Sequence, residues 1–204
     1  MDETNNLNLR ELLLVRPTRL RYVIRFSICP RIHDESVAEH SFFTAYLAMM
    51  IAQDLMTKGV EVNGYEVTSK ALLHDMDESY SGDMIRMFKH SSPEIKGAMD
   101  KAAEICMEAH SQEILGHGGL CEIWKQAKSE NLEGAIVSLC DFLSVLSYVV
   151  QEIQAGNHVM YEHLEDLKKF YETFHSKRYE LLKEYVDQAG RIIFAMEIRR
   201  IQIQ

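Results

Sequence analysis

The segment that most restricts the fold of this chain runs from about residue 132 to residue 155. It is strongly apolar, it has the length of a long helix, and it ends at Gly156-Asn157. One carboxylate, Asp141, stands inside it. A buried carboxylate costs several kcal/mol unless it is paired with a cation or coordinates a metal. The segment therefore predicts a core helix with a cation beside Asp141, either a metal or an arginine.

The rest of the chain favours helices, and strand patterns are nearly absent. Ser36 or a neighbour can begin a long helix, and Ser92-Pro93 is a typical start for another. No linker divides the chain, so we expect a single all-α domain over residues 1–204. The expected helices cover residues 7–16, 36–56, 65–76, 92–115, 120–129, 132–155 and 159–188, with a loop at 26–36 and a tail after 188.

Composition excludes several classes of protein. With 47% hydrophobic residues, 3 prolines and 10 glycines in 204 residues, the chain is not collagen-like, disordered or a disulfide scaffold. A chain of this size buries roughly 70% of its unfolded surface, so it needs no metal to fold, and a metal site in it is expected to be functional. The four cysteines show no CxxC, the N-terminus does not resemble a signal peptide, and no apolar run is long enough to span a bilayer. We therefore expect no membrane partner and a cytoplasmic location.

The formal net charge of −9 disfavours binding to long nucleic acid. Arginines nevertheless gather near the N-terminus, opposed there only by Glu11, and their planar forks suit phosphate or carboxylate. This pattern favours a small anionic ligand, although each arginine could instead pair with an acidic neighbour. The clustered arginines are Arg10, Arg16, Arg19, Arg21, Arg25 and Arg31.

Three places put metal-ligating residue types into apolar, helical surroundings: Glu39-His40, His74-Asp75 and Asp141. Each alone is weak, because a helical histidine is more often an ordinary polar residue than a ligand. Two histidines and two carboxylates together make a plausible site for a divalent ion. The order His, then His-Asp, then a mid-helix Asp resembles the HD-domain metal-dependent phosphohydrolases, which implies an all-α HD-domain helical bundle.

The resemblance extends to three longer stretches, VAEHS, LLHDMDESYSGDM and LCDFLSVLSYVVQEIQAGN. They look like the bacterial 5′-deoxynucleotidase branch of that superfamily, over about residues 10 to 175. A related branch in bacteriophages cleaves deoxynucleoside triphosphates, dATP in particular. The resemblance implies a homo-oligomer, a dimer or a hexamer, and places the enzyme in the host cytoplasm if a phage encodes it.

The matching positions carry the family's roles to this chain. The metal ligands match His40, His74, Asp75 and Asp141. Glu78 matches the carboxylate near the attacking water, and a helical turn would bring it to the same face as His74. Asp83 matches the residue that binds the sugar 3′-hydroxyl, whereas Arg25 and Lys89 match phosphate-binding positions.

Some positions depart from the deoxynucleotidase pattern. Phe26 stands where those enzymes have a tryptophan that crowds a 2′-hydroxyl. Arg86 adds a cation after the SGD turn that could serve a longer phosphate chain. Ile28 resembles the aliphatic residue that phage dATP hydrolases set against the purine. Phe26 and Ile28 could equally be core residues.

The expected activity is divalent-metal-dependent hydrolysis of deoxynucleoside 5′-phosphates at the α-phosphate, releasing the deoxynucleoside. The departures favour dATP and triphosphate release slightly over dAMP and phosphate release, and a strict monophosphate 5′-deoxynucleotidase is the alternative. One ion of Co, Mn, Zn, Mg or Fe is implied, with a second possible on the substrate phosphates. Rival interpretations are a cyclic-nucleotide or (p)ppGpp hydrolase, a non-catalytic nucleotide-binding HD module, and a plain helical interaction domain.

Overall fold

The structure is a computed structural model that describes residues 17–203, and within this range the chain is helical, with one isolated bridge between Ile24 and Ser36. The predicted all-α class is therefore confirmed, and the expected helix at 7–16 lies outside the described residues. The α-helices are α2 (Val37–Thr57), α3 (Gly64–Leu73), α4 (Glu78–Ser81), α5 (Arg86–Lys89), α6 (Pro93–Leu115), α7 (Gly119–Lys125), α8 (Leu132–Gln154), α9 (Tyr161–Tyr171) and α10 (Lys183–Ile203). The 3-10 helices are η1 (Pro17–Arg21), η2 (His158–Met160), η3 (Glu172–His175) and η4 (Lys177–Leu182).

Helix α2 begins where the sequence predicts, at a capping box formed by Ser36 and Glu39. The Ser36 hydroxyl accepts a hydrogen bond from the Glu39 amide, and the Glu39 carboxylate accepts one from the Ser36 amide at 2.8 Å. Glu39 is thus used to begin the helix, while the next residue, His40, points into the protein and is fully buried. The cap fixes the first turn of α2 and with it the place of His40.

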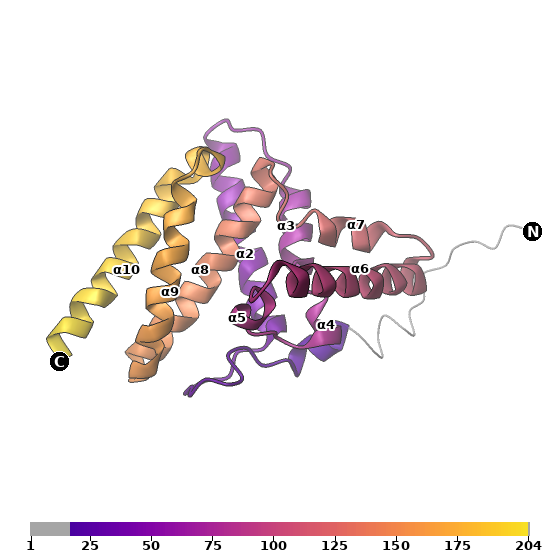
Figure 1. The fold of residues 1–204 in the computed structure, drawn as a ribbon. Coiled ribbons are helices and arrows are strands. Elements are labelled where there is room, and N and C mark those ends of the chain that lie inside the picture. The colour runs from indigo at the N-terminus through magenta and orange to yellow at the C-terminus, as the bar shows by residue number, and fades with distance from the viewer. Residues whose placement is uncertain (1–16, 204) are drawn as a thin grey trace, which may run out of the picture.

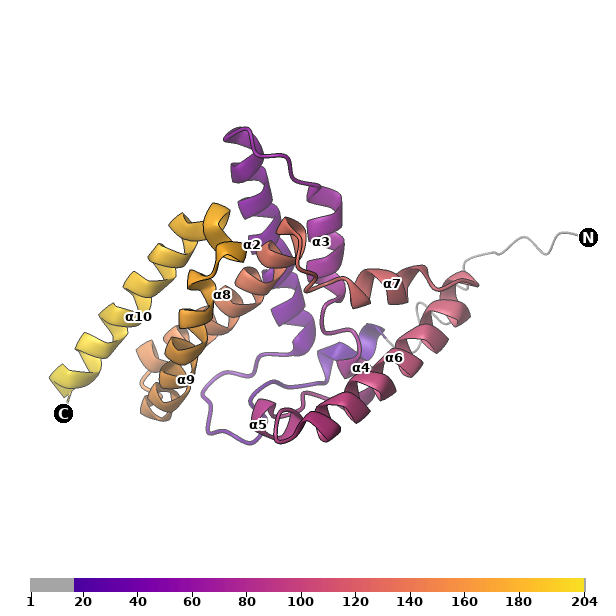
Figure 2. The ribbon, with the colours of Figure 1, turned by 45° about the horizontal axis from the view of Figure 1, so that its top comes forward.

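Helices α2, α3 and α8 pack against one another at the centre of the molecule (Figure 1). Helices α9 and α10 lie on one side of this group, and α6 and α7 lie on the other side (Figure 2). The main core is continuous from α2 through α8 to α10, and a smaller apolar cluster lies under α6 and α7. Fully buried core residues include Ala48, Val67, Ala71, Leu139, Val149 and Leu182.

The expected helix at 159–188 is wrong in its continuity. The chain breaks into η2, α9, η3 and η4, and α10 then continues to Ile203 where a tail was expected. The break lets Phe174 and Tyr179, both buried, pack ring against ring at a centroid distance of 4.7 Å. Phe142 of α8 packs on Phe174 at 5.0 Å. The aromatic residues of this segment are therefore packing residues, and burying them requires the chain to turn.

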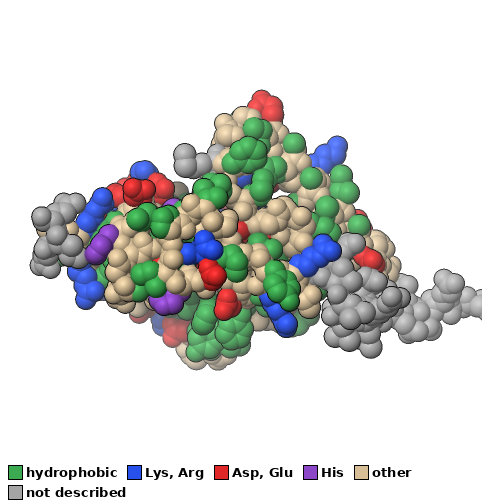
Figure 3. Space-filling model, turned by 90° about the horizontal axis from the view of Figure 1, so that it is seen from below, with side chains coloured by type: hydrophobic (Ala, Val, Ile, Leu, Met, Phe, Trp, Pro, Cys, Tyr) green, Lys and Arg blue, Asp and Glu red, His purple; other side chains and the backbone are tan. Residues whose placement is uncertain are grey.

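The expectation that no apolar segment is long enough to span a bilayer is wrong, because α8 is, among the described residues, the one helix long and apolar enough to do so by length and composition. Of its most apolar window, 67% is buried inside the protein. Its place between α2, α3 and α9 accounts for that apolarity as core packing. On the outer surface, seen from below in Figure 3, hydrophobic side chains are interspersed with charged ones.

Candidate active site

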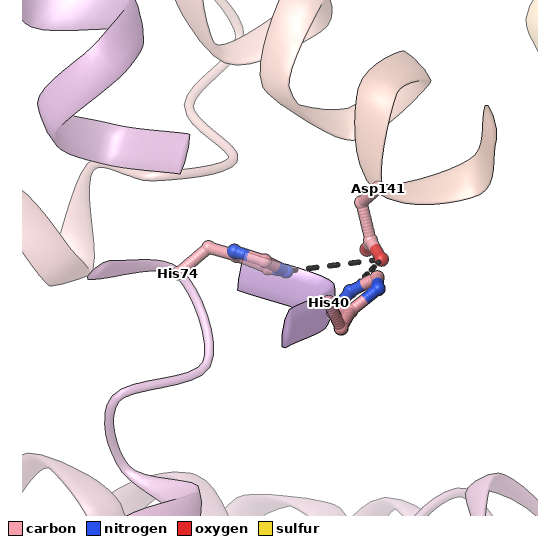
Figure 4. Close-up of side chains that lie close together, drawn as sticks. All are labelled: His40, His74 and Asp141. Atoms are coloured by element: carbon pink, nitrogen blue, oxygen red, sulfur yellow. Dashed lines mark hydrogen bonds and ion pairs between the residues drawn. The ribbon is translucent and has the colours of Figure 1, made fainter. Parts of the chain in front are cut away.

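The three central helices bring His40, His74 and Asp141 to one point (Figure 4). His40 comes from the first turn of α2, His74 caps the C-terminal end of α3, and Asp141 lies in the middle of α8. The Asp141 Oδ1 atom is 3.1 Å from His40 Nε2 and 3.8 Å from His74 Nε2. One ligand atom from each residue lies within 4.8 Å of the others, so the three could hold one metal ion.

Asp75 lies against the same cluster. Its Oδ2 atom is 3.1 Å from His74 Nε2 and 3.6 Å from His40 Nε2. It reaches this place because α3 ends at Leu73 and the chain turns directly after His74. The structure thus brings together all four residues that the sequence predicts as metal ligands.

The histidines are oriented for a metal by what their other nitrogens contact. The Nδ1 atom of His74 is 2.6 Å from the carbonyl oxygen of Ala71, to which it donates its proton. That bond turns the buried Nε2 atom toward the carboxylates of Asp75 and Asp141. His40 Nδ1 lies 3.1 Å from the Ser144 hydroxyl and 2.9 Å from Arg25 Nη1. An oxygen that accepts the Nδ1 proton is the outer partner typical of a metal-ligating histidine, and the Ala71 carbonyl and the Ser144 hydroxyl can serve in this way, so the residues present fit a divalent ion.

Opposite charges in the cluster stabilise the ionised forms of its side chains. Burial disfavours the charged form of His74, but Asp75 and Asp141 outweigh it and raise the His74 pKa to about 10. Burial also disfavours both carboxylates, yet His74 holds the pKa of Asp75 below its usual range, and Lys128 does the same for Asp141. Burial lowers the pKa of His40, and Arg25 adds to this. Two carboxylates therefore stay ionised around one protonated histidine. A divalent cation can take the place of the proton on that histidine.

Asp141 has the cation partner that its apolar setting predicts, and the partner is a lysine. Lys128 Nζ lies 2.6 Å from Asp141 Oδ2, on the opposite carboxylate oxygen from the one that faces the histidines. Lys128 belongs to the turn after α7, where a longer helix to residue 129 was expected. The pairing could not be found from sequence, because a turn lysine 13 residues before a helical aspartate carries no periodic relation to it.

The predicted phosphate-binding residue Arg25 lies beside the cluster. Its guanidinium donates to Glu35 Oε2 at 2.7 Å as well as to His40 Nδ1. The pairing with Glu35 realises the alternative in which an arginine meets an acidic neighbour, as does the 2.5 Å contact of Arg31 with Asp34. Arg25 has an acidic partner and also adjoins the metal cluster. Both interpretations of the arginines, pairing with an acidic neighbour and binding an anionic ligand, therefore apply to it.

Phe26 and Asp83 meet next to Arg25. The Phe26 amide donates to Asp83 Oδ2 at 3.1 Å, and Phe26 has a positive φ of 53°, a conformation uncommon for a residue with a side chain. The Phe26 ring stacks on Tyr148 at 5.2 Å and meets His163 edge-on at 5.0 Å. The ring is thus held at one place by contacts on two sides.

Glu78 and Lys89 line a hollow between α4 and α6. Burial, with Asp75 and Asp83, raises the Glu78 pKa to about 9, and its Oε2 atom is buried without a hydrogen-bond partner. The expectation that Glu78 shares a helical face with His74 is wrong, because α3 ends before His74 and Glu78 begins the separate helix α4. The turn between them still leaves Glu78 close enough to Asp75 for the two charges to interact.

Two predicted residues remain, Ile28 and Arg86. Ile28 lies on the loop before α2 with 70% of its surface exposed, so it is not a core residue. Arg86 lies in the short helix α5, and its side chain lies outside the described part of the structure. His33, on the same loop as Ile28, contacts Glu152 at 3.0 Å.

Comparisons with known proteins agree with this architecture. The chain is 28% identical over 144 residues to a 5′-deoxynucleotidase of Vibrio vulnificus, covering 69% of this chain and 74% of that protein. It is 25% identical over 146 residues to a 5′-deoxynucleotidase of Yersinia pestis, covering 69% and 73%.

Solved structures share the fold. A protein of Pyrococcus horikoshii superposes with a TM-score of 0.67 at 21% identity, covering 90% of this chain and 99% of that one. An HD-domain phosphohydrolase of Listeria innocua gives 0.60 at 22%, covering 88% and 95%. The HD phosphohydrolase DatZ of cyanophage S-2L, solved with dA and one catalytic Zn²⁺ ion, gives 0.57 at 17%, covering 87% and 94%.

A family model, that of the YfbR-like 5′-deoxynucleotidases, matches residues 14–189, which is most of the chain. This match includes every residue of the cluster and the residues around it. The chain belongs to the YfbR-like 5′-deoxynucleotidase family.

Proposed function

We propose that this protein hydrolyses 2′-deoxynucleoside 5′-phosphates at the α-phosphate, using a divalent ion held by His40, His74, Asp75 and Asp141. The observation that carries the proposal is the buried Nε2 atom of His74. It forms an ion pair with the carboxylate of Asp75 at 3.1 Å and faces that of Asp141 at 3.8 Å, and a divalent cation can take the place of the proton that it carries between them. When bound, the ion supplies Lewis-acid chemistry at the phosphoryl group and makes an attacking water available near neutral pH.

Glu78 is proposed to accept a proton from that water. Its carboxyl is buried, and its raised pKa means that it carries a proton at neutral pH in the metal-free chain. A nearby divalent charge lowers the pKa of such a carboxyl, which leaves a base that can accept a proton. The hollow that Glu78 lines is shared with Lys89, which adds positive charge for phosphate.

Arg25 is proposed to bind the α-phosphate. A guanidinium only donates hydrogen bonds, so its contact with His40 requires an unprotonated Nδ1. A histidine that uses Nε2 as a ligand carries its proton on Nδ1 and can donate it to Ser144. Arg25 then loses this partner and is available to the phosphate, while Glu35 keeps it in place.

Phe26 and Asp83 are proposed to hold the sugar. Asp83 fixes the Phe26 backbone in its positive-φ conformation, and Tyr148 fixes the ring. A ring held in this way can crowd a 2′-hydroxyl, and the second carboxylate oxygen of Asp83 can accept a hydrogen bond from a 3′-hydroxyl. Ile28, two residues after Phe26, is exposed and is proposed to contact the base.

Two candidate substrates differ in the number of their phosphates. The family match and the curated relatives favour a monophosphate such as dAMP, with phosphate as product. The second candidate is dATP with triphosphate as product, and the lysine in the hollow beside Glu78 favours it. Arg86, the first residue of α5, belongs to this second candidate.

We further propose that the chain acts as one domain in the cytoplasm and assembles with itself. The outward side of α2 is apolar, with half-exposed side chains spaced at helical intervals, and such a side is rarely left in water. These side chains are Phe42, Phe43, Tyr46, Met49 and Met50. Light scattering of the wild type and of Tyr46→Glu tests this, because a chain that is monomeric in both forms has no such assembly.

The test of the activity is an incubation of the purified protein with dAMP, dATP, AMP or ATP and Mn²⁺ or Co²⁺, with phosphate, pyrophosphate and triphosphate resolved. Phosphate from dAMP alone identifies a 5′-deoxynucleotidase, whereas triphosphate from dATP identifies the second candidate. Asp141→Ala is the matched control for a contaminating phosphatase. No turnover of any substrate, with metal binding intact, contradicts the proposal and favours a non-catalytic nucleotide-binding module.

A further inference from the structure

The ion pair between Lys128 and Asp141 is built into a fixed part of the chain. Lys128 Nζ touches Asp141 Oδ2 at 2.6 Å, and Oδ1 of the same carboxylate faces the two histidines. The lysine thus engages one oxygen and leaves the other for the cluster. This division of the two oxygens is the observation from which the inference starts.

The turn that carries Lys128 is anchored from three directions. Arg178 donates to the carbonyl oxygens of Lys128 at 3.3 Å and of Ser129 at 2.6 Å. The buried Lys70 donates to the Ser129 hydroxyl at 3.1 Å. The backbone of Ser129 also packs on Gly134 of α8 so closely that a Cβ atom there would lie 2.1 Å from the Ser129 carbonyl oxygen. These contacts hold the backbone of Lys128 and Ser129 in place against α8.

The anchoring point and the target lie on one face of α8. Gly134 and Asp141 are seven residues apart, which is about two helical turns. The backbone next to Lys128 lies against Gly134, so the lysine side chain can extend along this face of α8 until its ammonium group reaches Asp141. The absence of a side chain at Gly134 and the ion pair at Asp141 are thus parts of one arrangement.

We propose that Lys128 is a positioning residue for Asp141. Its ammonium group holds Oδ2 and thereby fixes the rotation of the carboxylate, so that Oδ1 alone is presented to the cation. Hydrogen bonds that orient a ligating carboxylate commonly contribute 10-fold to 100-fold in metal affinity or activity. The inference rests on the proposed metal site, since a carboxylate needs orienting only if it holds an ion.

Two other roles for Lys128 give opposite results. If its charge only competed with the cation, removal of the ammonium group would tighten metal binding. If it bound the substrate phosphate, removal would raise KM and leave metal affinity unchanged. Positioning predicts weaker metal binding and a lower kcat with KM nearly constant.

The experiment titrates Mn²⁺ alone into the metal-free full-length protein by calorimetry and measures kcat and KM for dAMP. Lys128→Met should bind Mn²⁺ about 10-fold to 100-fold more weakly and lose kcat, and Lys128→Arg should recover part of both. Lys125→Met is the matched control, because this neighbouring lysine pairs with Glu104 on the surface and should behave as wild type. Arg178→Gln, which loosens the turn without touching the cluster, should weaken Mn²⁺ binding in the same direction.

Unchanged or tighter Mn²⁺ binding by Lys128→Met overturns the inference, as does a rise in KM at constant kcat. Wild-type protein that binds no divalent ion at all overturns the proposed function and this inference with it. Wild-type binding together with unaltered Lys128→Met binding overturns the inference alone.

Discussion

The backbone amide of Phe26 donates a hydrogen bond to the carboxylate of Asp83, 57 residues further along the chain, at 3.1 Å. This bond joins the loop before α2 to the turn after α4. It holds Phe26 in a positive-φ conformation that costs on the order of 1 kcal/mol, and strain of this kind gathers at functional sites. The ring it presents is the proposed wall against a 2′-hydroxyl.

Replacing that ring should reduce sugar discrimination. An apolar wall rejects one added hydroxyl by up to about 100-fold, so Phe26→Ala should bring the kcat/KM values for dAMP and AMP closer by a factor of that order. Phe26→Trp, which restores a large ring, should keep the preference. Equal dAMP-to-AMP ratios in the wild type and Phe26→Ala would show that the ring does not select the sugar.

Removing a metal ligand should stop turnover and leave the fold intact. The carboxylates of Asp75 and Asp141 are held by histidines and Lys128, whereas the apolar core between α2, α3 and α8 is formed by other side chains. Asp75→Ala and Asp141→Ala should each lower kcat/KM by more than about 100-fold, the upper range for outer partners of a metal site. Circular dichroism and thermal unfolding check the fold. Wild-type turnover in either variant would refute the ligand assignment.

Metal binding should release a proton. Asp75 and Asp141 raise the His74 pKa to about 10, so the metal-free chain carries a proton on this residue at pH 7.5. A ligating histidine must be neutral, and the ion also lowers the pKa of Glu78, so binding should release at least one proton and tighten as pH rises toward the His74 pKa. Calorimetric titrations of Mn²⁺ in buffers of different ionisation enthalpy measure the number released. An apparent binding enthalpy that is the same in all buffers would contradict the assignment.

The helical class and the helix starts could be predicted because they are local. Ser36 and Ser92 cap the helices that the sequence assigns to them, since a cap depends on the next three residues alone. Apolar surroundings draw attention to the four residues expected as metal ligands, the resemblance to HD-domain phosphohydrolases assigns them that role, and the structure brings their side chains together.

Contacts between distant segments could not be predicted. Lys128 reaches Asp141 from a turn, and Glu35 reaches Arg25 from an irregular loop, so neither pair has a spacing that a sequence pattern would reveal. The continuous helix expected at 159–188 fails for a related reason. Its amphipathic pattern continues across Ser176, and only the packing of Phe174 and Tyr179 determines that the chain turns there.

Glu152 should anchor the loop that carries Phe26. Its carboxylate is 1% exposed and accepts hydrogen bonds from the amides of Ile32 at 2.7 Å and His33 at 2.8 Å and from the Asn157 side chain at 2.7 Å. Burial acts to raise its pKa, but these bonds outweigh burial and lower it. Glu152→Gln should therefore lower the free energy of unfolding at pH 7 by about 2 kcal/mol, the range for bonds to a charged group.

The difference in free energy of unfolding between wild type and Glu152→Gln should depend on pH. Because the folded pKa of Glu152 lies below the unfolded value of about 4.3, its contribution is complete above pH 5 and is lost as pH falls through the folded pKa. Urea unfolding of wild type and Glu152→Gln at pH 7, 5 and 3.5 should show a gap that narrows only at the lowest pH. Glu162→Gln, on the exposed side of α9, should match wild type throughout. A gap that stays constant down to pH 3.5 would mean that the ionised carboxylate does not hold the loop.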